Sequence, residues 1–177
     1  MDFWILYQLQ ELHSEILDRL MVGISFLGNA GWFWIALTIL FLCIPKYRKC
    51  AAVMAVALIL DLCICNLMLK PLIVRERPCW IDQSVELLVT MPTDYSFPSG
   101  HSAASFAAAV SVFFFHRREG IAALLLAALI AFSRLYLFVH FPTDVLGGIL
   151  TGILCACIAR KIIETAVRKK ISKMRKW

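Results

Sequence analysis

The stretch AAVMAVALILDLCICNLMLK, residues 51–70, decides the fold class of this chain. From Ala51 to Leu69 it contains one charged side chain, Asp61, and it ends at the cation Lys70. An α-helix needs about 20 consecutive, mainly apolar residues to cross the hydrocarbon core of a bilayer. The stretch therefore predicts a membrane-spanning helix that ends in a positive charge.

Four further apolar runs surround this one. Residues 21–45 carry no charge, and we expect Gly28 and Gly31 to bend the start of this run, so that Trp32 begins its regular part. Residues 101–115 are short for a span and rich in alanine, which is typical of the packed centre of a membrane bundle. The remaining two predicted spans cover residues 120–139 and 143–163.

Residues 3–20 differ from these runs. Apolar side chains recur at helical spacing from Ile5 to Leu20, with Glu11, Glu15 and Asp18 among the polar positions. Charges at this density disfavour a span, so we expect an amphipathic helix on the membrane interface.

The composition of the whole chain agrees with these local patterns. Its 177 residues are 61% apolar and 17% charged, and the mean hydropathy is +0.79. A soluble domain of this length keeps more polar surface. We therefore predict a single all-α integral membrane domain over residues 1–177, with about five transmembrane helices and one interfacial helix. The net charge of +6 is attributed to basic loops that face anionic lipid, and no nucleic-acid partner is expected.

The basic residues predict the orientation of the bundle. With five crossings, 13 of the 18 Lys and Arg residues fall on one side, which the positive-inside rule places in the cytoplasm together with the C-terminal tail. The five remaining basic residues gather near the opposite, outer surface, where the rule disfavours them. They are Arg19, Lys70, Arg75, Arg77 and Arg134.

Three polar segments interrupt the apolar pattern, and the predicted topology brings all three to the outer face. They are residues 70–78 (KPLIVRERP), 98–101 (PSGH) and 133–144 (SRLYLFVHFPTD). Lys70, Arg77 and Arg134 supply three cations that can neutralise the oxygens of a phosphoryl group as charge spreads in the transition state. The two arginines can each fork onto two oxygens.

Backbone groups are predicted to complete the phosphate site. Ser99, Gly100 and His101 open a helix, so that their N–H groups and the positive end of the helix dipole can hold an oxyanion. Gly100 has no side chain to keep the ligand away from the backbone.

Two histidines are assigned the covalent chemistry. His140 precedes a helix whose first turn contains Pro142 and Asp144, and the Asp144 carboxylate can fold back to hold one ring nitrogen. The other nitrogen is then free to attack phosphorus. His101, on a different helix, would be the general acid that protonates the leaving oxygen. Because cationic side chains supply the positive charge, we expect neither a metal ion nor another cofactor.

These segments resemble the motifs of the type 2 phosphatidic acid phosphatase superfamily, K-x6-R-P, P-S-G-H and S-R-x5-H-x3-D, and match every fixed position. The resemblance covers residues 70–144 directly. It implies a membrane phosphatase with a phosphohistidine intermediate on His140, acid–base chemistry by His101, and phosphate binding by Lys70, Arg77, Ser99, Gly100 and Arg134. Members of the family usually have six crossings, one more than the apolar runs of this chain predict.

Several polar residues have simpler interpretations. Arg75 and Glu76 are expected to form a solvated pair. Asp61 lies inside a predicted span, where an ionisable group is a functional candidate, but we favour a structural hydrogen bond to Asn66 or to a serine of the third span. Three tryptophans, Trp32, Trp34 and Trp80, are interpreted as interface anchors.

The leading functional hypothesis is a metal-independent lipid phosphatase of a bacterial plasma membrane, with its site on the extracytoplasmic side. Candidate substrates are undecaprenyl diphosphate, phosphatidate, phosphatidylglycerol phosphate and a lipid A phosphate, with a modest preference for the first. The partners are thus a lipid phosphate and the membrane lipids. Two alternatives stay open: a phosphotransferase that passes the phosphoryl group from His140 to a lipid alcohol, and a non-enzymatic transporter.

Overall fold

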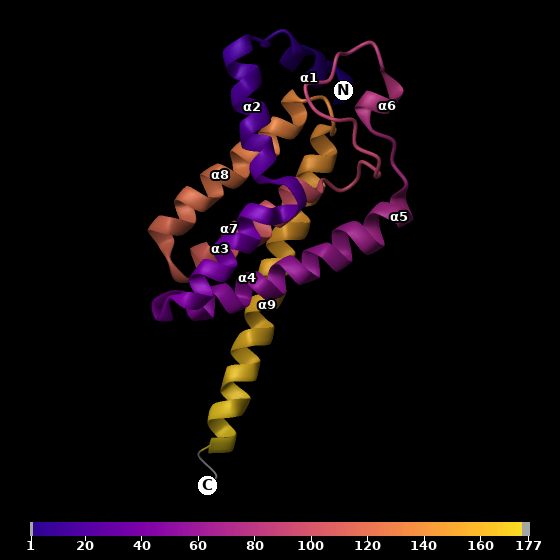
Figure 1. Cartoon of the computed structure of the whole chain (residues 1–177). Helices are drawn as coiled ribbons and strands as arrows, with labels where there is room; N and C mark the ends of the chain where they lie inside the picture. The colour runs from indigo at the N-terminus through magenta and orange to yellow at the C-terminus, as the bar shows by residue number, and fades with distance from the viewer. Residues whose placement is uncertain (1, 175–177) are drawn as a thin grey trace.

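The computed structural model describes residues 2–174, and every regular element in this range is a helix (Figure 1). Three short helical segments, η1 (Asn29–Gly31), η2 (Pro45–Tyr47) and the π-helix η3 (Leu62–Leu69), connect the α-helices. The α-helices are α1 (Asp2–Gln10), α2 (Glu15–Leu27), α3 (Trp32–Cys43), α4 (Arg48–Asp61), α5 (Lys70–Ile73), α6 (Pro78–Ile81), α7 (Gly100–Phe115), α8 (Arg117–Tyr136) and α9 (Pro142–Met174).

Three helical stretches in the described range are long and apolar enough to cross a membrane. A fourth span results if α2 and α3, which meet at a 45° bend, are counted as one broken crossing. The bend lies where the two glycines predict it, with positive φ angles at Ala30 and Gly31. The three unbroken stretches lie within Pro45–Ile81, Arg117–Tyr136 and Pro142–Lys169.

The helix α7 is the centre of the bundle, as its short alanine-rich sequence predicts. Its 16 residues make a helix of about 24 Å, less than the hydrocarbon thickness. It packs against α4, α8 and α9, and its Ala103, Ala107 and Ala108 are fully buried. Small side chains let the neighbouring helices approach closely. Trp34 also packs here and donates from Nε1 to Ser105 Oγ at 2.9 Å, so its interpretation as an interface anchor is wrong.

The N-terminus differs from the single interfacial helix predicted over residues 3–20. The helix ends at Gln10, and α2 starts at Glu15 and runs on to Leu27, where the 45° bend to α3 follows. The helix α1 lies against the end of α8 that leads to His140 (Figure 1). Near the start of α2, Tyr136 Oη donates to Asp18, whereas Arg19 and Glu15 form an exposed pair on the helix surface.

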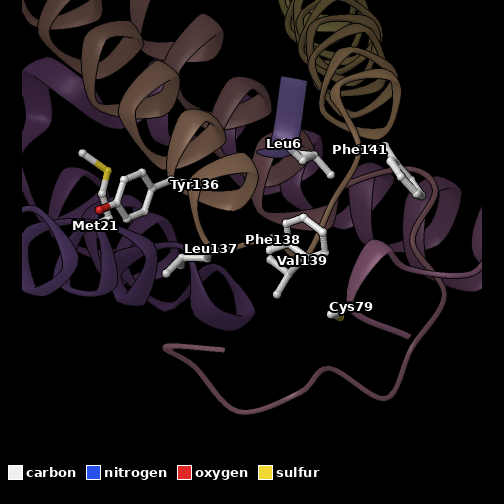
Figure 2. Close-up of a cluster of buried hydrophobic side chains, with 8 residues drawn as sticks. All are labelled: Leu6, Met21, Cys79, Tyr136, Leu137, Phe138, Val139 and Phe141. Atoms are coloured by element: carbon white, nitrogen blue, oxygen red, sulfur yellow. The ribbon is translucent and has the colours of Figure 1, made fainter. Parts of the chain in front are cut away.

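The cluster drawn in Figure 2 explains how α1 is held. Leu6 of α1 is fully buried among the residues that connect α8 to α9, which include Leu137, Phe138 and Val139. Phe3 adds an edge-on contact with the Phe141 ring at 5.1 Å between centroids. The connection is therefore a buried apolar segment against which α1 packs.

The C-terminal helix α9 is longer than the predicted span over residues 143–163. It continues to Met174 and extends beyond the rest of the bundle (Figure 1), so the basic tail is helical as far as it is described. The last predicted tail residues, Arg175 and Lys176, lie outside the described residues. The other end of α9 begins at Pro142, next to the predicted catalytic residues.

Candidate active site

His140 lies at the end of the buried connection between α8 and α9, and only 1% of it is exposed. Its Nε2 atom is 3.0 Å from Nη1 of Arg77. Because a guanidinium group can only donate, Nε2 accepts this hydrogen bond and carries a lone pair. The lone pair points at Arg77, which the sequence predicts to bind phosphate.

Asp144 lies beside the other ring nitrogen of His140, but the contact is indirect. Oδ2 of Asp144 is 3.6 Å from Nδ1 of His140, which is longer than a hydrogen bond. Ser96 lies between them, with Oγ 2.5 Å from Asp144 Oδ2 and 3.4 Å from Nδ1. The backbone N–H of Phe141 donates to the same Oδ2 at 2.8 Å. Asp144 is thus fixed by the first turn of its own helix and by a serine that the sequence analysis did not single out.

Arg75 holds the second oxygen of Asp144, and the expected solvated pair with Glu76 is wrong. Nη1 of Arg75 donates to Asp144 Oδ1 and to Thr143 Oγ1, both at 2.6 Å. Nη2 donates to Asp2 Oδ2 at 3.1 Å, and the guanidinium stacks on the Phe141 ring at 4.4 Å. The arginine therefore ties the first residues of α1 to the start of α9.

Lys70 and Arg77 lie together and share one counterion, Asp94. The Lys70 ammonium group pairs with Oδ2 of Asp94, and Arg77 Nη2 donates to Oδ1 at 2.8 Å. Arg77 is held further by Nε donating to the Asp94 carbonyl oxygen and by Nη1 donating to the Val139 carbonyl oxygen, each at 2.7 Å. Both cations are buried, whereas about half of the Asp94 side chain is exposed. A carboxylate thus lies between the two cations that the sequence predicts to bind phosphate.

The charges around this pair shift the pKa values of Asp94 and His140 in the same direction. Burial alone would raise the pKa of Asp94, but Lys70 and Arg77 outweigh it and lower the value to about 2. Burial, and then the nearby Arg77, Arg134 and Lys70, hold the pKa of His140 well below its ordinary value of 6.5. His140 is therefore neutral at neutral pH, as a nucleophile must be.

Arg134 reaches the site from α8 and is 95% buried, with 5% of its surface exposed. Its Nη1 donates to Ser25 Oγ of α2. Its Nε has no partner among the described residues. Together with His101 and Asp94 it lines a cavity of about 680 Å³, so this third cation lies beside a ligand-sized space.

The PSGH segment forms the N-terminus of α7 as predicted, with its amides in unequal roles. Ser99 is the N-cap, whose Oγ accepts from the Ser102 N–H at 3.4 Å. Its own N–H donates to the Asp144 carbonyl oxygen, so only the amides of Gly100 and His101 remain available to an oxyanion. A Cβ atom on Gly100 would lie 3.7 Å from Nζ of Lys70, so a side chain there would project into the phosphate site.

His101 also starts α7, and Asn29 holds its ring. The Nε2 atom is 2.9 Å from Asn29 Oδ1, which lies in the bend between α2 and α3. A Cβ atom on the neighbouring Gly28 would stand 2.6 Å from Cδ2 of the same ring, so glycine is needed there. The bend between α2 and α3 thus makes room for His101.

The predicted site residues converge at one end of the bundle, and the sequence analysis missed four that join them there. Two of these, Asp94 and Ser96, lie shortly before the PSGH segment in the sequence, and that closeness could have pointed to them. Arg75 lies within the first motif, and Asn29 is the polar residue in a glycine-containing bend. The structure also groups no three His, Cys, Asp or Glu side chains within residues 2–174 in a way that could hold a metal ion.

The chain is similar in sequence and in structure to known membrane phosphatases. The PAP2 superfamily model matches residues 50–168. An undecaprenyl-diphosphatase of Sulfolobus acidocaldarius is 31% identical over 161 residues, which cover 90% of this chain and 77% of that protein. The crystal structure of Aquifex aeolicus LpxE superposes with a TM-score of 0.80 at 26% identity, over 90% of this chain and 94% of that one. The crystal structure of a phosphatidylglycerolphosphate phosphatase from Bacillus subtilis superposes with a TM-score of 0.76 at 27% identity, over 93% of this chain and 85% of that one.

Proposed function

Because the chain belongs to the PAP2 superfamily of membrane lipid phosphatases, we propose that it hydrolyses a lipid phosphate or diphosphate through a phosphohistidine on His140. The substrates named for its relatives, undecaprenyl diphosphate and phosphatidylglycerol phosphate, define the class of headgroup. Both place a phosphate at the membrane surface. Any preference for undecaprenyl diphosphate within this class rests on analogy to the relatives alone.

One observation carries the proposal: the Nε2 lone pair of the buried, neutral His140 faces Arg77 at 3.0 Å, within the site that Lys70 and Arg77 form. Phosphate bound between these cations would have its phosphorus next to that nitrogen. Arg134 adds a third cation beside the same cavity as Asp94 and His101. Electrostatic stabilisation by fixed donors is usually the largest single contribution to such a reaction.

The proposed reaction has two steps with balanced bonds. In the first, Nε2 of His140 attacks phosphorus, the bond from phosphorus to the leaving oxygen breaks, and His101 gives that oxygen a proton. In the second, His101 takes a proton from water, the water oxygen bonds to phosphorus, and the P–N bond breaks to release inorganic phosphate. Ser96 and Asp144 keep the proton on Nδ1 throughout and stabilise the charge that the ring gains.

Asp94 has a defined place in this cycle. Its carboxylate neutralises Lys70 and Arg77 in the ligand-free enzyme, and we propose that substrate phosphate displaces it. Its exposure and its position in an irregular loop make the displacement feasible without unpacking a helix. The positive charge from three side chains then does the work for which many phosphatases use metal ions, so that the reaction proceeds without a metal.

The site is proposed to face the extracytoplasmic side of a bacterial plasma membrane. Most basic residues lie on loops and a C-terminal helix at the opposite end of the bundle, which the positive-inside rule assigns to the cytoplasm. A lipid phosphatase with this orientation meets headgroups in the outer leaflet.

Phosphate release from a panel of lipid phosphates, measured with and without a chelator of divalent cations, tests the proposal. We expect release from at least one lipid, unaffected by the chelator and lost in His140→Ala. Activity that the chelator abolishes would contradict the metal-free mechanism. The panel needs an undecaprenyl diphosphate, a phosphatidate and a phosphatidylglycerol phosphate, presented in the same detergent.

A further inference from the structure

A cavity of about 650 Å³ leads away from the phosphate site into the membrane-embedded part of the bundle. Lys70, Asp94 and His101 line one end of it. The rest runs between α3, α4, η3 and α7, and apolar side chains such as Ile39 and Leu58 form most of its wall. A space of this shape suits the hydrocarbon part of the lipid whose phosphate lies at Lys70.

The cavity wall contains one ionisable group away from the phosphate, Asp61. The residue is 2% exposed, and its Oδ1 has no hydrogen-bond partner among the described residues. The expected structural bond to Asn66 or to a serine of α7 is therefore not made by this oxygen. An unpartnered polar atom in an apolar environment costs free energy, so each such atom in a native structure calls for an explanation.

The π-helix η3 explains why Asp61 faces the cavity at all. In an α-helix, nine residues make about two and a half turns, so Asp61 and Lys70 would lie on opposite sides. Between them, residues Leu62–Leu69 form i→i+5 bonds, and because each turn then takes more residues, the same nine make roughly two turns. Asp61, Asn66 and Lys70 consequently all line the one cavity. π-Helical segments are frequent at functional sites.

We propose that Asp61, with Asn66 above it, is a polar subsite that selects lipid phosphates carrying a hydroxyl group on the hydrocarbon part. Asp61 and Asn66 both line the cavity, so a hydroxyl there can donate to an oxygen of the Asp61 carboxyl group and accept from the Asn66 amide. The inference rests on the proposed function, because it assumes that the phosphate of the same lipid is bound at Lys70.

The position of the subsite limits where the hydroxyl lies. Nine residues of α-helix rise about 13 Å, and the π-helix, which is wider and rises less per residue, shortens this distance, so the hydroxyl lies about 13 Å or less from the phosphate. A β-hydroxyacyl chain places a hydroxyl close to the headgroup, whereas a plain isoprenoid chain has no group that could pair with Asp61. The subsite therefore opposes the preference for undecaprenyl diphosphate and favours a hydroxyacyl lipid.

Matched substrates test this selection directly. Phosphatidate with two β-hydroxymyristoyl chains is compared with dimyristoyl phosphatidate, with farnesyl diphosphate and p-nitrophenyl phosphate measured beside them. We expect kcat/KM for the hydroxylated lipid to exceed that for the plain one by roughly three- to tenfold, as one hydrogen bond allows. In Asp61→Leu the difference should vanish, while hydrolysis of p-nitrophenyl phosphate stays unchanged. Asp61→Asn, which keeps an acceptor oxygen, should retain part of the preference.

The experiment distinguishes a failure of the Asp61 subsite from a failure of the proposed phosphatase function. Equal kcat/KM for the two phosphatidates in the unmodified enzyme, or the same preference in the enzyme and in Asp61→Leu, would overturn the subsite while leaving the phosphatase proposal intact. No phosphate release from any of the four substrates by folded enzyme would instead overturn the proposed function. The first comparison needs no variant, so it decides the matter even if leucine at position 61 prevents folding.

Discussion

Two buried aspartates, Asp144 and Asp61, lie in the same bundle with opposite surroundings. Asp144 is fully buried, and both oxygens are satisfied by Arg75, Ser96 and the Phe141 N–H. Asp61 is almost as buried, but its Oδ1 has no partner in the described part of the chain. Burial alone therefore does not reveal what a carboxylate does. A fully bonded carboxylate orients another group, whereas one that faces a cavity without a partner is available to a ligand.

Exchanging each aspartate for asparagine gives the largest expected contrast. Asp144→Asn should lower kcat for p-nitrophenyl phosphate by about 10²–10⁴-fold, because it weakens the hold on the Nδ1 proton of His140, as in other oriented histidines. Asp61→Asn should change the same value by less than about twofold, because this substrate does not reach the cavity floor. Comparable losses in both variants would show that the two carboxylates act alike. Steady-state kinetics on purified, thermally stable protein measures both.

The partners of Asp144 should matter less than Asp144 itself. Arg75→Gln removes one of its bonds but leaves those from Ser96 and the Phe141 N–H, so we expect a loss of kcat of about tenfold. The matched control is Arg19→Gln, which removes an exposed helix-surface pair with Glu15 and should leave kcat unchanged. If the two variants behave alike, the contact of Arg75 with Asp144 has no part in positioning.

A third carboxylate, Asp94, differs from both because it is ion-paired and half-exposed. Asp94→Asn should bind inorganic phosphate several-fold more tightly, because the product no longer competes with an internal anion for Lys70 and Arg77. The inhibition constant of phosphate measures this change, with Asp82→Asn, on the same loop but away from the cations, as the control. An unchanged or weaker inhibition would mean that phosphate does not take the position of Asp94.

The smallest effect is expected in the dependence of kcat/KM on pH. An unperturbed histidine of pKa 6.5 would lose about threefold of its neutral form between pH 7 and pH 6. Because burial and three cations hold the pKa of His140 well below that value, it stays neutral over this range. The acid limb of kcat/KM attributable to the nucleophile should therefore lie well below pH 6.5. A protonation of His140 near pH 6.5, followed by NMR in the ligand-free enzyme, would contradict the electrostatic description of the site.

The pKa of Asp94 makes a related prediction about stability. A carboxylate whose pKa falls to about 2 on folding contributes stability at pH values above its ordinary 3.8 and loses it as pH falls towards 2. The stability difference between the enzyme and Asp94→Asn should therefore be constant near neutral pH and shrink below about pH 4. Thermal unfolding at several pH values measures it.

The sequence predicted most of the site because catalytic residues occur in short motifs at fixed spacing from helix ends. The segments that contain Lys70, His101 and His140 each begin or end a helix, so a topology from apolar runs was enough to bring them together. Asp94 and Arg75 were missed for the opposite reason. Their roles depend on side-chain contacts across 17 and 69 positions of sequence separation, which no periodicity encodes.

The membrane layout was predicted less well at its N-terminus. Apolar spacing among residues 3–20 predicted one interfacial helix, but the chain breaks after Gln10 and forms two helices, α1 and α2. The π-helix η3 was also beyond prediction. It has the same apolar composition as the α-helix before it, yet it turns Asp61 toward Lys70 and so changes a structural residue into a candidate ligand site.

The most direct test of the central claim is to trap the phosphoenzyme. Enzyme mixed with a radiolabelled lipid phosphate and quenched in alkali should carry label on a base-stable, acid-labile bond at His140. His140→Ala should carry none and release no phosphate, a loss of roughly 10⁴-fold or more, whereas His116→Ala, at the opposite end of α7, should behave like the unmodified enzyme. Label on another residue, or phosphate release from His140→Ala at an unchanged rate, would contradict the assignment of His140 as the nucleophile.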